Sequence, residues 1–160
     1  MTQGMEERLA LLEAREAIRE TISNYAFYVD AGRYDEWADL FTKDGVFDIG
    51  ARGRFQGREQ LIAFLKGRHG PQGPKSRHYI MNHVINISGT EATARSYVAV
   101  TNEEGDTSLF GAGVYDDRLR KEGDRWRFAE RKVTLEYMVP LEKGWGGKNR
   151  QIQGVPAAER

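Results

Sequence analysis

The sequence predicts a single α+β domain in which helices and one strongly curved, mixed but mostly antiparallel sheet form a cone around a central apolar pocket. Three observations predict this class. Apolar residues recur at helical spacing near the start of the chain, the second half alternates between apolar and polar residues, and short turn-forming stretches divide that half into long segments. A chain of 160 residues with 39% hydrophobic content is long enough to bury one core.

The first predicted element is an amphipathic helix over Glu6 to Asp30. Its apolar positions recur at spacings of seven, four, three and four, which places them on one face of the helix. These positions are Leu11, Ile18, Ile22, Tyr25 and Val29. Gly32 is suited to end the helix, because glycine readily adopts the backbone conformation found just beyond helix C-termini.

Two shorter helices and a hairpin are predicted next. Tyr34 to Phe41 predicts a second helix, and the residues from Val46 to Ile49 predict a short strand. Gly53 to Gly57 is the expected hairpin partner of that strand. Arg58 to Lys66 predicts a third helix, whereas Gly67 to Ser76, rich in glycine and proline, predicts a loop.

Four long strands joined by short turns predict an antiparallel meander. Strands of this length twist and coil, so helices packed across their concave face leave a cone-shaped interior. The domain should therefore cover residues 1–140, and residues 141–160 should form an extended arm that is either a lid over the pocket or a disordered end. The predicted strands are His78 to Ile87, Glu91 to Asn102, Thr107 to Arg120 and Arg125 to Val139.

The composition excludes several classes of function. Basic and acidic residues are equal in number at 24 each, so no positive field would attract nucleic acid or an anionic membrane. The absence of cysteine and of a signal peptide fits a cytoplasmic protein, and no apolar run is long enough to span a bilayer. No H-x-x-x-H pair or glycine-rich phosphate loop is present, so we expect no metal and no cofactor.

Arg131 lies on the apolar side of the last predicted strand, together with Val133. A guanidinium is costly at such a position unless it is paired or used. One interpretation is a buried structural ion pair or an arginine at the rim of the sheet. The other is an anion or oxyanion stabiliser inside the pocket.

Asp30 and the histidines are further candidates for catalytic groups. Asp30 lies in the last turn of the first helix, where the helix dipole disfavours a carboxylate, so it either caps the following turn or holds a partner inside the cone. Tyr25 would lie nearby with a phenol that needs a hydrogen-bond partner. Either His78 or His83 could act as a general base. The alternation of the strand does not show which of them faces the interior, because apolar residues occupy every second position on the side of each histidine.

Several runs together resemble the SnoaL-like branch of the nuclear transport factor 2-like superfamily, over roughly Glu6 to Pro140. This branch includes scytalone dehydratase, bile-acid dehydratase and hexachlorocyclohexane dehydrochlorinase, and the resemblance implies a cystatin-like α+β barrel. The runs are Tyr25-Ala-Phe-Tyr-Val-Asp30, Trp37-Ala-Asp-Leu-Phe41, Asp44-Gly45, Arg77-His78-Tyr79 and Trp126-Arg-Phe128.

The resemblance also implies site residues. An aspartate ending the first helix and a histidine opening the first long strand form the catalytic dyad of the enzymes in this branch, which selects Asp30 and His78 and makes His83 an unlikely base. The dehydrochlorinase run H-Y-x-x-N is matched by His78, Tyr79 and Asn82, and its functional arginine falls at Arg131. Positions of the bile-acid and scytalone enzymes that carry a further acid or histidine are not matched, so their particular substrates are not expected here.

The favoured hypothesis is a cofactor-independent lyase of the dehydratase or dehydrohalogenase type. His78, oriented by Asp30, would remove a carbon-bound proton, and Tyr25 and Arg131 would stabilise the departing group or an enolate. The substrate would be small, lipophilic and cyclic. The side chains expected to contact it are Val29, Trp37, Phe41, Phe47, Asn82 and Val133.

Two other classes of function remain possible alternatives. An isomerase or cyclase would use the same proton removal, and a small-molecule-binding or assembly module would use the same fold without chemistry. The resemblance further implies a homodimer or homotrimer, formed through an outer sheet face that would present Arg95 and Tyr97.

Overall fold

A computed structural model describes residues 4–143 of the chain. Within this range the α-helices are α1 (Met5–Asp30), α2 (Tyr34–Ala38) and α3 (Gly57–His69). Short 3-10 turns are η1 (Gly50–Arg52), η2 (Gly70–Gln72) and η3 (Leu141–Lys143). The strands are β1 (Phe41–Asp48), β2 (Arg54–Gln56), β3 (Arg77–Ser88), β4 (Glu91–Glu104), β5 (Thr107–Glu122) and β6 (Arg125–Pro140).

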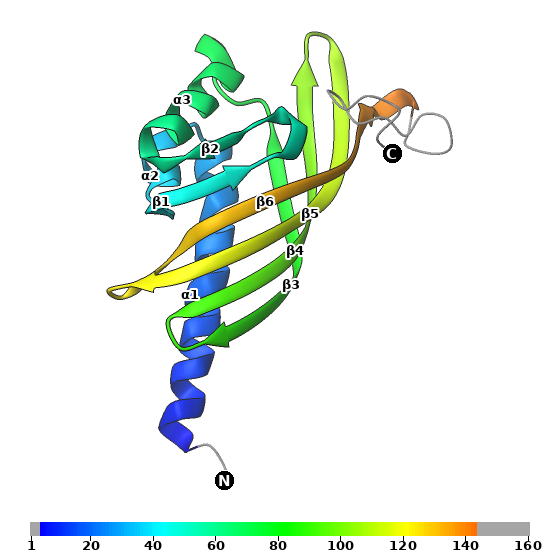
Figure 1. The fold of residues 1–160 in the computed structure, drawn as a ribbon. Helices are drawn as coiled ribbons and strands as arrows, with labels where there is room; N and C mark the ends of the chain where they lie inside the picture. Colours follow the sequence, from blue (N-terminus) through cyan, green and yellow to red (C-terminus); the bar gives the residue numbers. More distant parts are fainter. Residues whose placement is uncertain (1–3, 144–160) are drawn as a thin grey trace.

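The strands form one sheet in the order β2-β1-β6-β5-β4-β3. All neighbours are antiparallel except β1 and β6, which run parallel. The long strands curve across α1, while α2, α3 and β2 gather at one end of the sheet (Figure 1). The predicted curved, mixed and mostly antiparallel sheet is therefore confirmed.

The predicted ends of the second and third helices are wrong, and the short strand predicted from Val46 already begins at Phe41. The second helix ends at Ala38 and not at Phe41, because Phe41 already belongs to β1, and the Phe128 amide donates to the Leu40 carbonyl oxygen at 2.8 Å. The third helix continues through Gly67 to His69, because one glycine costs a helix only about 1 kcal/mol. It stops at Gly70, whose φ of 59° is left-handed.

A β-bulge in β3 explains why the alternation of apolar and polar residues did not show which of its two histidines faces inward. The pairing of β3 with β4 shifts register between Met81 and Val84, and Asn82 there has a φ of 59°. Asparagine tolerates this left-handed conformation better than most residues. The extra residue returns His83 to the face that His78 occupies, so both histidines point inward while Met81 and Val84 are exposed.

The C-terminal arm lies almost entirely outside the described residues, which end with η3 just after β6. Its interpretation as a lid or a disordered end therefore stays a prediction. Among residues 4–143, none of the helices has the length and apolar content needed to cross a membrane.

Candidate active site

A cavity of about 290 Å³ opens between the end of α1, the C-terminal half of α3, the η1 turn and the inner face of the sheet. This volume is at the lower end of the range for small-molecule sites. Much of its wall is apolar, and the polar groups converge from different elements. Apolar lining residues include Val29, Phe47, Phe64, Val98, Val100 and Val133.

Asp30 and His78 meet at the wall of this cavity, where His78 is a lining residue. His78 Nδ1 lies 2.7 Å from Asp30 Oδ1, and the His78 backbone N–H donates to Asp30 Oδ2 at 2.7 Å. The Ser76 hydroxyl donates to Asp30 Oδ1 at 3.4 Å. These hydrogen-bond donors offset the unfavourable interaction between the carboxylate and the C-terminal end of the helix dipole. Asp30 therefore has the partner inside the cone that was one of the two interpretations of its position.

The pairing sets the proton positions on the imidazole. A carboxylate only accepts hydrogen bonds, so His78 Nδ1 carries a proton, and in the neutral form of the imidazole the lone pair is on Nε2. His78 lines the cavity, and its side chain is 16% exposed while that of Asp30 is 11% exposed. The cavity therefore contains a nearly buried imidazole that can accept a proton from a bound molecule.

Arg131 lies behind the cavity and is fully buried. It forms two hydrogen bonds with Asp117, at 2.8 Å and 2.7 Å, and both side chains are 0% exposed. Burial alone would lower the pKa of Arg131, but the Asp117 carboxylate raises it above its usual value. The structural ion pair, one of the two interpretations from the sequence, is thus present, and Arg131 is not among the residues that line the cavity.

The Arg131 guanidinium also stacks on three aromatic rings. Its central carbon lies 4.1 Å from the ring centroid of Tyr25, 4.3 Å from that of Tyr115 and 4.2 Å from that of Phe128. Tyr25 and Tyr115 both line the cavity. Burial raises the pKa of both phenols, and the Arg131 charge opposes this rise in each. The phenols therefore remain protonated donors at neutral pH.

This burial predicts that Tyr25 and Tyr115 do not ionise in the folded protein near pH 10, the ordinary tyrosine pKa. Because the folded pKa is raised, the stability that each phenol contributes is complete below pH 10 and is lost as the pH rises from there toward the folded value. Tyrosinate absorbance of the folded wild type and of Tyr25→Phe should match just above pH 10. In urea, the variant should show one fewer titrating tyrosine. A smaller folded-state signal from Tyr25→Phe would contradict the prediction.

The other predicted substrate contacts divide into two groups. Val29, Phe47 and Val133 line the cavity, as do Tyr25 and His78. Trp37, Phe41 and Asn82 do not. Trp37 and Phe41 are core residues packed behind Phe47, at ring-centroid distances of 5.6 Å and 6.3 Å. Asn82 is exposed at the bulge, where its backbone conformation accounts for an asparagine at this position.

The structure adds residues that sequence reasoning missed. Tyr115, Ser76, His69, Arg52 and Arg68 all line the cavity. The sequence did contain a signal for the buried ion pair behind the cavity. Asp117 lies among the apolar positions of its strand, and it is directly opposite Arg131 in the pairing of β5 with β6. An acid and a base at inward positions of adjacent strands predict a buried ion pair.

Comparisons with known proteins agree with this architecture. A family model described as a SnoaL-like domain matches residues 10–132. The beta subunit of the methanesulfonate monooxygenase hydroxylase from Methylosulfonomonas methylovora is 27% identical over 156 residues, covering 82% of this chain and 85% of that protein.

Solved structures share the fold at lower identity. A hexachlorocyclohexane dehydrochlorinase of type 2 has a TM-score of 0.77 at 22% identity, covering 92% of this chain and 99% of its own. A protein from Novosphingobium aromaticivorans named for scytalone dehydratase has a TM-score of 0.72 at 23% identity, covering 92% and 97%. An NTF2-like protein with a cystatin-like fold from that organism has a TM-score of 0.69 at 23% identity, covering 94% and 96%. These likenesses confirm the predicted cystatin-like fold.

Proposed function

Because the chain belongs to the SnoaL-like domain family, within the NTF2-like superfamily, we propose that it is a cofactor-independent lyase acting on a small lipophilic substrate. One observation carries the proposal. The imidazole of His78 faces an apolar cavity with Nε2 available, while both oxygens of Asp30 bind the same histidine residue from behind. Such a group is suited to remove a proton from carbon.

The proposed reaction is a β-elimination. His78 Nε2 takes a proton from the carbon next to a carbonyl group, and the electrons of that C–H bond pass to the carbonyl oxygen as an enolate. When the enolate collapses, its electrons form the new carbon–carbon double bond and the bond to a β-hydroxyl or β-halide breaks. A departing hydroxide receives the proton from His78 and leaves as water, whereas a halide leaves as the anion and the imidazolium then loses its proton to solvent. Asp30 holds the histidine in position throughout and stabilises the imidazolium that forms.

Tyr25 is proposed to donate a hydrogen bond to the carbonyl oxygen as it becomes an enolate. Arg131 acts through this phenol, because its charge lies over the Tyr25 ring and makes the phenol a stronger donor. Arg131 is therefore a positioning residue and not a group that touches the substrate. The cyclic, lipophilic substrate expected from the sequence matches a small cavity with Phe47 and Val133 in its wall.

A direct assay uses 3-hydroxycyclohexanone, a small cyclic ketone with a β-hydroxyl group. The purified chain with EDTA should release water from it and produce the conjugated enone, which ultraviolet absorbance detects. Production at the rate of buffer alone would count against the lyase. Exchange of the protons next to the carbonyl without loss of water would instead favour an isomerase or cyclase.

A second candidate is a non-catalytic module that assembles with a larger enzyme or binds a small molecule. The observation that favours it is the 27% identity to a hydroxylase beta subunit. Asp30→Asn separates the two candidates. A binding module should keep its affinity for the ketone and have no turnover to lose, whereas the lyase should lose turnover.

A further inference from the structure

We propose that His69 donates a hydrogen bond through its Nε2–H group to an oxygen of the substrate, and that this oxygen is the β-hydroxyl that leaves. Tyr34 is the positioning residue that fixes the donor on Nε2. The inference rests on the proposed function in taking the reaction to be an elimination begun by His78. It adds the leaving group, because a hydroxyl oxygen accepts a hydrogen bond readily whereas a halide on carbon accepts one poorly.

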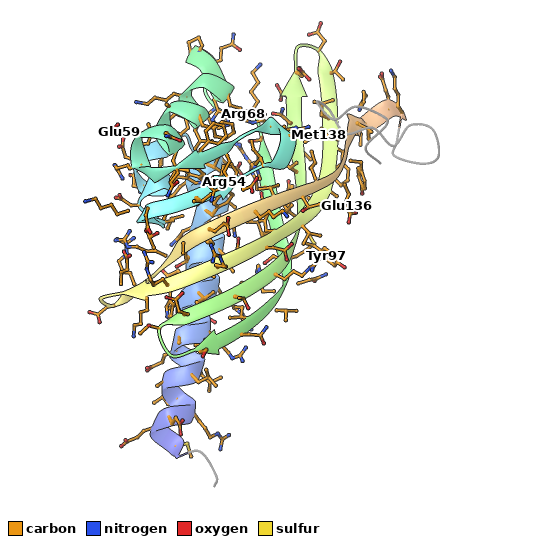
Figure 2. All side chains as sticks on the ribbon, viewed as in Figure 1. Arg54, Glu59, Arg68, Tyr97, Glu136 and Met138 are labelled. Atoms are coloured by element: carbon orange, nitrogen blue, oxygen red, sulfur yellow. The ribbon has the colours of Figure 1, made fainter. Side chains whose placement is uncertain are left out.

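His69 is the last residue of α3 and belongs to the wall of the same cavity as His78. Arg68 of α3 and Met138 of β6, both lining residues, lie at the same end of the molecule, where the helix faces the sheet (Figure 2). The charges of His78 and Asp30 both act on the pKa of His69, so the three groups lie within the range of direct charge interactions. A small molecule that fills a cavity of about 290 Å³ therefore lies near both imidazoles.

Tyr34 holds one nitrogen of the His69 ring. The Tyr34 hydroxyl lies 3.0 Å from His69 Nδ1, and the two ring centroids are 5.6 Å apart with their planes inclined by 35°. Tyr34 opens α2 and packs against the apolar core, and it is not one of the described residues that line the cavity. Nδ1 is therefore turned toward the protein, and Nε2 is the nitrogen left for a ligand.

The contact with Tyr34 decides which nitrogen of His69 carries the proton. A neutral imidazole has one N–H group and one acceptor nitrogen. A phenol is a far stronger acid than the N–H group of a neutral imidazole, and burial raises the pKa of Tyr34, so the phenol is protonated at neutral pH and acts as the donor. Nδ1 then accepts this hydrogen bond, which leaves the ring proton on Nε2.

His69 is neutral at pH 7. Burial lowers the pKa of His69, the charges of Arg68 and His78 lower it further, and Asp30 opposes them. A neutral imidazole donates a hydrogen bond without adding a positive charge to the cavity. It therefore does not oppose the imidazolium that forms on His78 when that residue takes the proton from carbon.

The two imidazoles of the cavity thus have opposite tautomers. His78 carries its proton on Nδ1, facing Asp30, and accepts at Nε2, whereas His69 accepts at Nδ1, facing Tyr34, and donates at Nε2. An elimination needs both a base at carbon and a donor at each oxygen that gains negative charge.

The leaving hydroxyl is the oxygen that still needs a donor, because Tyr25 is assigned to the carbonyl oxygen. As the C–O bond breaks, the electrons of that bond stay on the departing hydroxide, and the His69 Nε2–H group stabilises this charge. The hydroxide then takes its proton from His78 and leaves as water. His69 keeps its own proton throughout.

The first test locates the proton on His69 by NMR. His78→Asn, labelled with ¹⁵N-histidine, lacks the proposed base and retains His69 and His83, whose signals His83→Asn distinguishes. At about pH 8, above the ordinary histidine pKa, the His69 proton should be on Nε2. Adding 3-hydroxycyclohexanone should shift this Nε2–H signal, and cyclohexanone, which lacks the hydroxyl group, should shift it less. Tyr34→Phe, placed in the same background, should populate both tautomers of His69.

The second test is a pair of variants that replace different nitrogens of the ring. The amide of an asparagine reaches the position of Nδ1, and the amide of a glutamine reaches toward that of Nε2. His69→Asn should lower the rate of water loss from 3-hydroxycyclohexanone by roughly a hundredfold, as the loss of one donor to a developing negative charge does. His69→Gln should restore much of the rate, because its amide N–H group can donate from the Nε2 side.

Deuterium uptake at carbon 2 of cyclohexanone is the control for both variants. It should stay within about threefold of wild type, because removal of that proton by His78 needs no leaving group. If His69→Asn does not fold, Tyr34→Phe takes its place and should lower the rate of water loss, because part of the His69 population then carries its proton on Nδ1.

A proton on Nδ1 of His69, equal shifts from the two ketones, or equal rates of water loss in His69→Asn and His69→Gln would overturn the proposal. The NMR result is independent of turnover. If the wild type releases no water, the lyase fails, while the ligand-induced shift still tests whether His69 donates to the hydroxyl group.

Discussion

Asp117→Asn is expected to lower the free energy of unfolding by about 3–5 kcal/mol, the usual cost of leaving one member of a buried ion pair without its partner. Asp117 and Arg131 are both fully buried and share two hydrogen bonds at 2.8 Å and 2.7 Å. The asparagine has the same shape but leaves the guanidinium uncompensated among aromatic rings. Urea denaturation monitored by circular dichroism measures the change.

The neighbouring residue provides the matched control. Asp116 pairs with Arg95 at 3.6 Å, but its side chain is 44% exposed, so Asp116→Asn should cost no more than about 1 kcal/mol. Replacing both buried partners, in Asp117→Leu/Arg131→Met, should recover most of the lost stability, because no charge then remains buried. Equal losses in Asp117→Asn and Asp116→Asn would contradict the described burial of the pair.

His78→Asn is expected to lower the rate of water loss from 3-hydroxycyclohexanone by roughly a hundredfold to ten-thousandfold, the usual contribution of a general base. Asparagine keeps a polar side chain of similar reach but cannot accept the proton at neutral pH. The natural control is His83→Asn. His83 occupies the same strand and also has an engaged Nδ1, at 2.8 Å from Ser96 Oγ, but it does not line the cavity.

The His83→Asn rate should stay within about threefold of wild type, well inside the range attributed to the base itself. Comparable losses in the two variants would indicate that the effect comes from disturbing β3 and not from the missing base. The free energy of unfolding of both variants, measured alongside, shows whether either substitution unfolds the strand.

Much of the fold follows from local patterns that the sequence displays. The apolar face of α1, from Ile18 to Val29, predicted its helix within one residue at the N-terminal end. The four long strands were predicted with their turns, because alternation over many residues is a strong signal. The boundaries that failed lie where tertiary pairing decides, as at Phe41, whose partner Phe128 is far away in the chain.

The site could be predicted only in part. Asp30 and His78 are 48 residues apart, and only the fold brings the end of α1 against the start of β3; resemblance to a family selected this pair where periodicity did not. The bulge at Asn82 could not be predicted, because it changes which residues face inward without changing the composition of β3. Arg52 and Arg68 were not recognised as cavity residues, because η1 was expected to be part of a hairpin and the end of α3 to be part of a loop.

In the proposed reaction His78 removes a proton from carbon inside this cavity. Deuterium uptake from D₂O at carbon 2 of 3-hydroxycyclohexanone, followed by NMR, measures that step whether or not the hydroxyl group then leaves. Deuterium uptake should be at least about a hundredfold above buffer with the wild type and near the buffer rate with His78→Asn. Uptake by the wild type at the buffer rate, or equal uptake by wild type and His78→Asn, would contradict it.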